Sequence, residues 1–124
     1  MGIQRLAMVS IPVSDQKRAK EFYTNVLGFE LVRDESFRES TRWIEVRPAA
    51  DQPSFTLVTW FPSMPAGSLR GVVLLADDLQ ATCTNLRSRG LTVPDVQSAP
   101  WGRYTTFNDP DGNGWVLQEA RSKG

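Results

Sequence analysis

The feature that most constrains this chain is an internal repeat. Asp15 precedes a segment with helical spacing of apolar residues, and Asp78 precedes a similar segment 63 residues later. Gly28 and Gly90, 62 residues apart, close the two segments. An aspartate accepts hydrogen bonds from the free N–H groups of a first helical turn, and a glycine readily takes the left-handed conformation that ends a helix. The repeat therefore predicts two halves built on one plan.

The first half, about residues 5–60, is expected to begin with a strand over 5–13 and a helix that ends at Gly28. Alternating apolar residues predict further strands over 29–33, 42–46 and 54–60. The charged stretch 34–40 lacks periodicity and is expected to be a loop. Apolar residues spaced by three or four give the helix one buried stripe: Ala19, Phe22, Tyr23, Val26 and Leu27.

The second half, about residues 70–119, repeats this order after a linker rich in proline and glycine. We expect a strand over 71–76, a helix with Leu79, Cys83 and Leu86 on its buried stripe, and strands over 91–93, 102–107 and 114–119, with a loop at 94–101. The chain is thus predicted to form a single α+β domain over 1–124. Its two tandem βαβββ modules would form curved mixed sheets around a cavity, with the helices on the outer face.

Composition excludes several classes of function. Histidine is absent, which rules out Ser–His and Cys–His nucleophile pairs and His-ligated metal sites within one chain. Fourteen basic residues balance fourteen acidic ones, so we expect no nucleic-acid partner. No apolar run approaches the roughly 20 residues that span a bilayer, so we expect no membrane partner. The single cysteine and the lack of a signal-like start favour a cytoplasmic location.

Two sequence signatures carry a resemblance to a known family. The segment Val9–Asp15, followed by Phe22-Tyr23 and Leu27–Phe29, resembles the opening of vicinal oxygen chelate proteins, and Phe107–Asn113 with Trp115–Glu119 resembles their close. This superfamily includes glyoxalase I, extradiol dioxygenases, fosfomycin resistance proteins and bleomycin resistance proteins. The resemblance implies their fold and a homodimer, but the fold hosts unrelated chemistries.

The family's metal enzymes carry ligands on the first and last strands of each half. Carried over by position, these ligands fall on side chains without an oxygen or nitrogen donor: Met8, Leu57, Gly71 and Val116. Hard divalent metals need such donors. An alignment slip brings in only Ser10, Thr56, Thr59 or Gln118. We therefore predict no metal and no cofactor, which disfavours a metal-dependent glyoxalase or dioxygenase.

Two smaller motifs favour structural roles. Asp109, Asp111 and Asn113 match the start of a calcium-binding loop, but Ala120 occupies its twelfth position and strands flank it, so a turn held by Asp and Asn side chains is favoured. Cys83 lies on a helix stripe and is expected in the core rather than as a nucleophile.

The tryptophans are placed by strand alternation. Trp115 is expected to face the helices, whereas Trp43 is expected to point into the cavity. Aligning the two halves makes Trp43 equivalent to Tyr104, and a purely structural role for Trp43 stays open. Trp60 and Trp101 lie near the ends of strands, where they could serve a dimer interface or the rim of a pocket.

The candidate ligand-binding residues are mostly apolar or aromatic with a few hydroxyl groups, which is typical of a small-molecule site. They are Met8, Ser10, Trp43, Glu45, Leu57, Thr59, Gly71, Val73, Tyr104, Thr106, Val116 and Gln118. We predict a metal-free protein of the bleomycin-resistance kind that binds a small apolar or aromatic molecule. Bleomycin itself is not favoured, because a strongly cationic ligand needs a more acidic cavity.

An enzymatic alternative rests on two residues. Glu45 and Tyr104 are the candidate catalytic groups of a metal-independent lyase, isomerase or cyclase, in which either would transfer a proton. A surface salt bridge between Glu45 and Arg42 or Arg103 is the competing structural interpretation.

Overall fold

The computed structural model describes residues 2–120, which form strands and helices in the repeated order. The elements of the first half are β1 (Met8–Pro12), α1 (Gln16–Glu21), the π-helical turn η1 (Phe22–Val26), β2 (Glu30–Arg38), β3 (Thr41–Arg47) and β4 (Ser54–Val58). Those of the second half are β5 (Val72–Ala76), α2 (Leu79–Ser88), β6 (Gln97–Ala99), β7 (Gly102–Asn108) and β8 (Gly114–Glu119).

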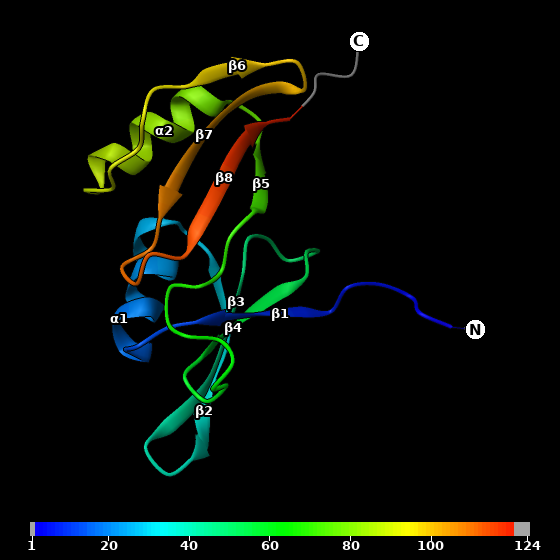
Figure 1. The fold of residues 1–124 in the computed structure, drawn as a ribbon, viewed down its shortest axis with the longest axis vertical. Coiled ribbons are helices and arrows are strands. Elements are labelled where there is room, and N and C mark those ends of the chain that lie inside the picture. The colour runs from blue at the N-terminus through cyan, green and yellow to red at the C-terminus, as the bar shows by residue number, and fades with distance from the viewer. Residues whose placement is uncertain (1, 121–124) are drawn as a thin grey trace.

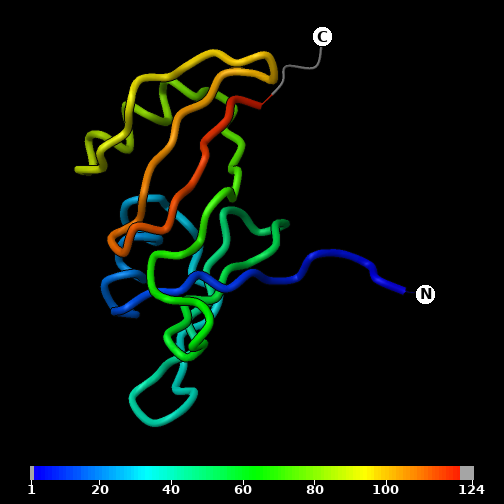
Figure 2. Tube along the Cα trace, in the orientation of Figure 1, coloured from blue at the N-terminus to red at the C-terminus, as the bar shows by residue number. Residues whose placement is uncertain are grey.

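Each half builds its own four-stranded sheet, in the orders β1-β4-β3-β2 and β5-β8-β7-β6. The first strand of each half pairs in parallel with the last one, and the remaining pairs are antiparallel. The predicted tandem βαβββ modules with mixed sheets are therefore confirmed. The sheets lie at opposite ends of an elongated chain, with α1 and α2 along one side of it (Figure 1). The linker between them crosses the middle (Figure 2).

Both helices begin and end where the sequence predicts. The carboxylates of Asp15 and Asp78 each accept the backbone N–H three residues further on, at 3.1 and 3.0 Å. Gly28 and Gly90 adopt positive φ angles of 77° and 91° at the other ends. The first helix differs in its second half, where the chain widens into the π-helical turn η1 and buries Phe22.

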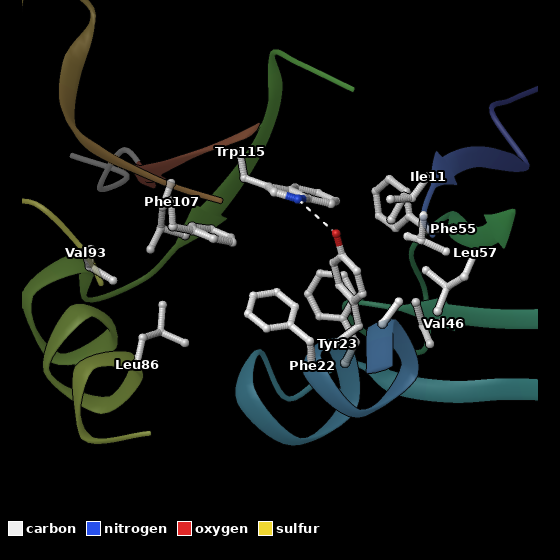
Figure 3. Close-up of a cluster of buried hydrophobic side chains, with 14 of the residues drawn as sticks. Ile11, Phe22, Tyr23, Val46, Phe55, Leu57, Leu86, Val93, Phe107 and Trp115 are labelled. Atoms are coloured by element: carbon white, nitrogen blue, oxygen red, sulfur yellow. Dashed lines mark hydrogen bonds between the residues drawn. The ribbon is translucent and has the colours of Figure 1, made fainter. Parts of the chain in front are cut away.

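The hydrophobic core lies at the junction of the two halves. The Trp115 ring of β8 packs against the first half, with centroid distances of 5.8 Å to Tyr23 and 5.2 Å to Phe55. It also stacks on Phe107 of its own sheet at 6.1 Å (Figure 3). The expected placements of Trp115 on the helix side and of Cys83 in the core are confirmed, since these side chains are 1% and 0% exposed.

A buried polar network crosses the same junction. Tyr23 Oη donates to Asp109 Oδ2 at 2.6 Å and accepts from Trp115 Nε1 at 3.2 Å. Asn113 Nδ2 donates both to Asp109 Oδ2 and to the carbonyl of Pro12, at 2.8 and 2.9 Å. The predicted Asp/Asn-stabilised turn over 109–113 is confirmed, and it also joins β8 to the first half.

The expected loop at 34–40 is wrong, because β2 continues to Arg38. The charged residues conceal the strand, and one of them, Asp34, is paired with neighbouring elements rather than left to water. The Asp34 carboxylate accepts from Lys20 Nζ of α1 at 2.6 Å and from Arg42 of β3. One register shift before this stretch, between Leu31 and Arg33, and one within it, between Ser36 and Arg38, also blur the alternation.

The expected strand at 91–93 is also wrong, and β6 falls inside the stretch expected to be a loop. Pro94 has no N–H to donate to a neighbouring strand. The Arg87 guanidinium instead donates to the carbonyls of Val93 and Pro94, at 2.9 and 3.1 Å. Leu91 and Val93 therefore pack against the core as irregular chain.

Candidate ligand-binding site

Each sheet has its helix and the core on one face and leaves the other face open. Strand alternation places Met8, Ser10, Trp43 and Glu45 on the open face of the first sheet, because their neighbours Val9, Ile11, Ile44 and Val46 pack into the core. The open face of the second sheet carries Val73, Tyr104, Thr106, Val116 and Gln118, with Val73, Val116 and Thr106 adjacent in register.

An aromatic cluster marks the open face of the first sheet. We define it as Phe37 of β2, Trp43 of β3 and Trp60, which follows β4. The Phe37 ring lies 5.5 Å from Trp43 and 4.9 Å from Trp60, and the two indoles lie 6.3 Å apart at an angle of 25°. Phe37 is 40% exposed and both tryptophans are half-buried, so the cluster presents ring surface to the outside.

Glu45 lies beside this cluster and is held by two hydrogen bonds. Its Oε1 accepts from Trp43 Nε1 at 3.2 Å, and its Oε2 accepts from Ser54 Oγ at 2.7 Å. The salt bridges considered from the sequence are wrong, because Arg42 pairs with Asp34 and Arg103 pairs with Glu119. The half-buried carboxylate therefore interacts with an indole and a hydroxyl group.

The open face of the second sheet is largely aliphatic. Val73 and Leu75 of β5 are 49% and 67% exposed. Tyr104 donates its hydroxyl to Gln97 Oε1 at 3.2 Å, and its ring lies 4.6 Å from Trp101. The predicted equivalents Trp43 and Tyr104 thus occupy corresponding faces, but one chain does not bring them together.

Three cavities of this chain each contain only part of the candidate set. The first, of about 500 Å³, is lined by Glu45 and Ser54 together with Arg5 and Arg47. The second, of about 600 Å³, lies between the halves and includes Val73. The third, of about 390 Å³, includes Thr106. None of the three holds residues of both open faces.

Three candidate residues lie elsewhere than expected. Leu57 is 0% exposed and packs in the core, because β4 directs it and Phe55 toward the helix side of the sheet. Leu57 therefore does not line the open face. Thr59 is exposed beyond the end of β4, and Gly71, at φ +83°, directly precedes β5.

The sequence reasoning missed Phe37, Ser54, Thr56 and Leu75, which lie on the same sheet faces as the candidates, although Ser54 and Thr56 are themselves buried. Thr56 lies opposite Glu45 in register, and its buried hydroxyl has no hydrogen-bond partner among the described residues. Strand alternation is the signal that identifies Ser54, Thr56 and Leu75. Phe37 was not predicted as a site residue because its part of β2 was expected to be a loop.

The residues at the family's metal-ligand positions do not suit a metal ion. Leu57 is in the core, and Met8, Gly71 and Val116 offer no side-chain oxygen or nitrogen. Within residues 2–120, no group of three or more Asp, Glu or Cys side chains is arranged to hold a metal. No step of a mechanism can be assigned to a metal at these positions.

The helices within residues 2–120 are too short or too polar to cross a membrane.

The fold and the signatures agree with a family match over residues 5–117, and the chain belongs to the Glyoxalase/Bleomycin resistance protein/Dioxygenase superfamily. It is similar to the solved structure of TnmS3, an antibiotic binding protein from Streptomyces sp. CB03234, with 44% identity, coverage of 98% of this chain and 99% of that one, and a TM-score of 0.91. A glyoxalase/bleomycin resistance protein from the same organism is 46% identical over 92% of this chain and 99% of that one, with a TM-score of 0.82. A lactoylglutathione lyase of Salmonella typhimurium is 29% identical, covering 97% of this chain and 96% of that protein.

Proposed function

We propose that this protein binds a small apolar or aromatic molecule without a metal, in a cavity that two copies of the chain form together. The observation that carries the proposal is the aromatic cluster of Phe37, Trp43 and Trp60 on an open sheet face. Aromatic rings that remain partly exposed provide a stacking surface for a planar ligand. The antibiotic-binding role printed for TnmS3 supports the same class of function.

The role of the second copy follows from the shape of the chain. A ligand site normally buries roughly 70–90% of the surface of its ligand. A single open sheet face cannot enclose a ligand to that extent. In one chain the open faces belong to sheets at opposite ends (Figure 1). A two-fold axis would place the aromatic face of each copy over the aliphatic face of the other, which gives two equivalent sites per dimer. It would also cover Val73 and Leu75, whose side chains are largely exposed in the single chain.

Sequestration is the activity that these groups support without further chemistry. Glu45 and Tyr104 are engaged with neighbouring side chains, and proton transfer by either one stays a prediction. We place the dimer in the cytoplasm, where the single buried thiol of Cys83 would remain reduced.

The central test is the affinity of Trp43→Ala for planar aromatic compounds, measured by calorimetry on the purified protein. Loss of one stacking contact of about 1 kcal/mol or more should weaken binding about fivefold or more. Leu31→Ala is the matched control, because Leu31 is exposed on the same sheet but pairs with Val46, which faces the core. Equal affinities for Trp43→Ala and the unaltered protein would refute the proposed site.

Two further measurements test the assembly and the absence of a metal. Sedimentation at micromolar concentration should give twice the 13.9 kDa mass of the chain. Elemental analysis should find no stoichiometric divalent metal. A 13.9 kDa species would refute the shared cavity. About one metal per chain, lost together with binding on chelation, would refute metal independence.

A further inference from the structure

The carboxylate of Glu45 is hydrogen-bonded to two uncharged side chains of its own sheet. It accepts one hydrogen bond from the Trp43 indole at 3.2 Å and one from the Ser54 hydroxyl at 2.7 Å. Among residues 2–120 the ion pairs leave Glu45 out, although Arg33 lies beside it in register and Arg47 lies two residues along the strand. Arg33 pairs with Glu35 and Arg47 with Glu30, so the groups within hydrogen-bond distance of the Glu45 carboxylate are the indole and the Ser54 hydroxyl. Arg47 lies near enough for its charge to interact with that of Glu45.

A hydrogen bond from an indole N–H to a carboxylate fixes the orientation of the ring and also changes its electron density. At 3.2 Å this hydrogen bond is long for one to a charged acceptor, but together with the packing of the ring against Phe37 and Trp60 it restricts rotation of the Trp43 side chain. A negative charge at the N–H edge also increases the electron density over the ring faces. The face of an aromatic ring is already its negative region, so a partner ring with a positive face gains most from stacking on it.

We propose that Glu45 is a specificity-determining residue of the ligand site, which positions and polarises Trp43 so that the site prefers planar, electron-poor rings. This inference rests on the proposed function, in which Trp43 supplies a stacking surface. The first cavity, of about 500 Å³, is lined by Glu45 and Ser54 together with Arg5 and Arg47, so the residue that bonds to the Trp43 indole also borders open space. Glu45 acts through Trp43 and is a positioning residue rather than a catalytic one.

The test uses a pair of probes that match in shape and differ in electronics. Naphthalene has negative ring faces, whereas octafluoronaphthalene has nearly the same outline and positive ring faces. Quenching of tryptophan emission gives the affinity of the dimeric protein for each probe. The unaltered protein should bind octafluoronaphthalene at least threefold more tightly, after correction for the preference of each probe for octanol over water.

Glu45→Gln keeps a hydrogen-bond acceptor of the same size and removes the charge. It should lower the preference for the fluorinated probe about threefold or more, with the affinity for naphthalene nearly unchanged. Glu35→Gln is the matched control, because Glu35 lies directly opposite Trp43 in register and its ion partner is Arg33, so the substitution removes a nearby charge that is not hydrogen-bonded to the indole. Ser54→Ala leaves the charge of Glu45 in place and should retain the preference.

The outcomes separate this inference from the proposed function. An equal loss of affinity for both probes in Glu45→Gln would mean that the residue supports the site only structurally, which overturns the inference while binding stands. The same preference in Glu45→Gln and the unaltered protein would overturn it as well. If Trp43→Ala binds both probes as well as the unaltered protein does, the proposed site itself fails.

Discussion

Replacing Tyr23 with phenylalanine removes one buried oxygen atom that two other groups depend on. Tyr23 is 0% exposed, and its hydroxyl both donates to Asp109 Oδ2 at 2.6 Å and accepts from Trp115 Nε1 at 3.2 Å. Hydrogen bonds to charged groups contribute about 1.5–3 kcal/mol, and an unpartnered buried N–H costs about 1–3 kcal/mol. Asp109 keeps the donors of Asn113, which limits the loss, so we expect Tyr23→Phe to destabilise the protein by about 2–4 kcal/mol.

The assay is thermal unfolding at one fixed protein concentration, because association also contributes to the apparent stability. At roughly 3–5 °C per kcal/mol for a chain of this size, the midpoint should fall by about 6–20 °C. Tyr104→Phe is the control, since its hydroxyl bonds to an exposed partner and its loss should cost less than about 1 kcal/mol. An unchanged midpoint for Tyr23→Phe would refute the argument that the network holds the two halves together.

The same variant has a signature in alkaline solution. Burial, and next the charge of Asp109, raise the pKa of the Tyr23 hydroxyl far above its ordinary value near 10. The folded state therefore retains this proton at a pH where the unfolded state releases it. The contribution of the Tyr23 hydroxyl to stability is complete below pH 10 and falls as the pH rises above it. The unaltered protein should lose stability more steeply than Tyr23→Phe between about pH 10 and 11. Parallel curves would contradict this linkage.

Three other substitutions test particular contacts. A Cβ at Gly67 would clash with the Asp111 carbonyl oxygen, whereas one at Gly71, with a similar φ of +83°, meets nothing within 4 Å. Urea unfolding should show that Gly71→Ala lowers the free energy of unfolding by about 1–2 kcal/mol. Gly67→Ala should lower it further. Hydrogen bonds from Lys20 and then Arg42 lower the pKa of Asp34 below its usual 3.8. Asp34→Asn should therefore destabilise the protein at pH 7, and the difference in stability should shrink as the pH falls below about 3.8. Leu57→Ala should cost about 2–5 kcal/mol in calorimetric unfolding, and Thr59→Ala close to nothing, because only Leu57 lies in the core.

The parts of the fold that the sequence predicts are those set by local chemistry. Asp15 and Asp78 cap helices, Gly28 and Gly90 end them, and the turn at 109–113 needs only its own side chains and short-range hydrogen bonds. The capping aspartates and the terminal glycines occur in both halves, so the repeat itself could be recognised. The strand at β2 could not, because its charges find partners on α1 and β3, which are distant in the sequence.

The site was predictable in part for the same reason. Alternation correctly separates Trp43 and Glu45 from Ile44 and Val46, since it depends only on the strand itself. Leu57 was misplaced because its position was carried over from the ligand pattern of metal enzymes, whereas its own alternation with Thr56 and Val58 directs it into the core. The bond between Glu45 and the indole depends on side-chain geometry that the order of residues does not specify.

The way the core is built is the physical basis for the proposed second copy at the ligand site. The two halves are joined through their helix-side faces, where Trp115 packs against Tyr23 and Phe55 and Asn113 bonds to the carbonyl of Pro12. This packing uses the helix-side faces of the two sheets and leaves their other faces without a partner among residues 2–120. In the proposed function, dimerisation both covers Val73 and Leu75 and encloses the ligand beside Trp43. Ligand binding and dimerisation are then linked, and each must strengthen the other by the same factor.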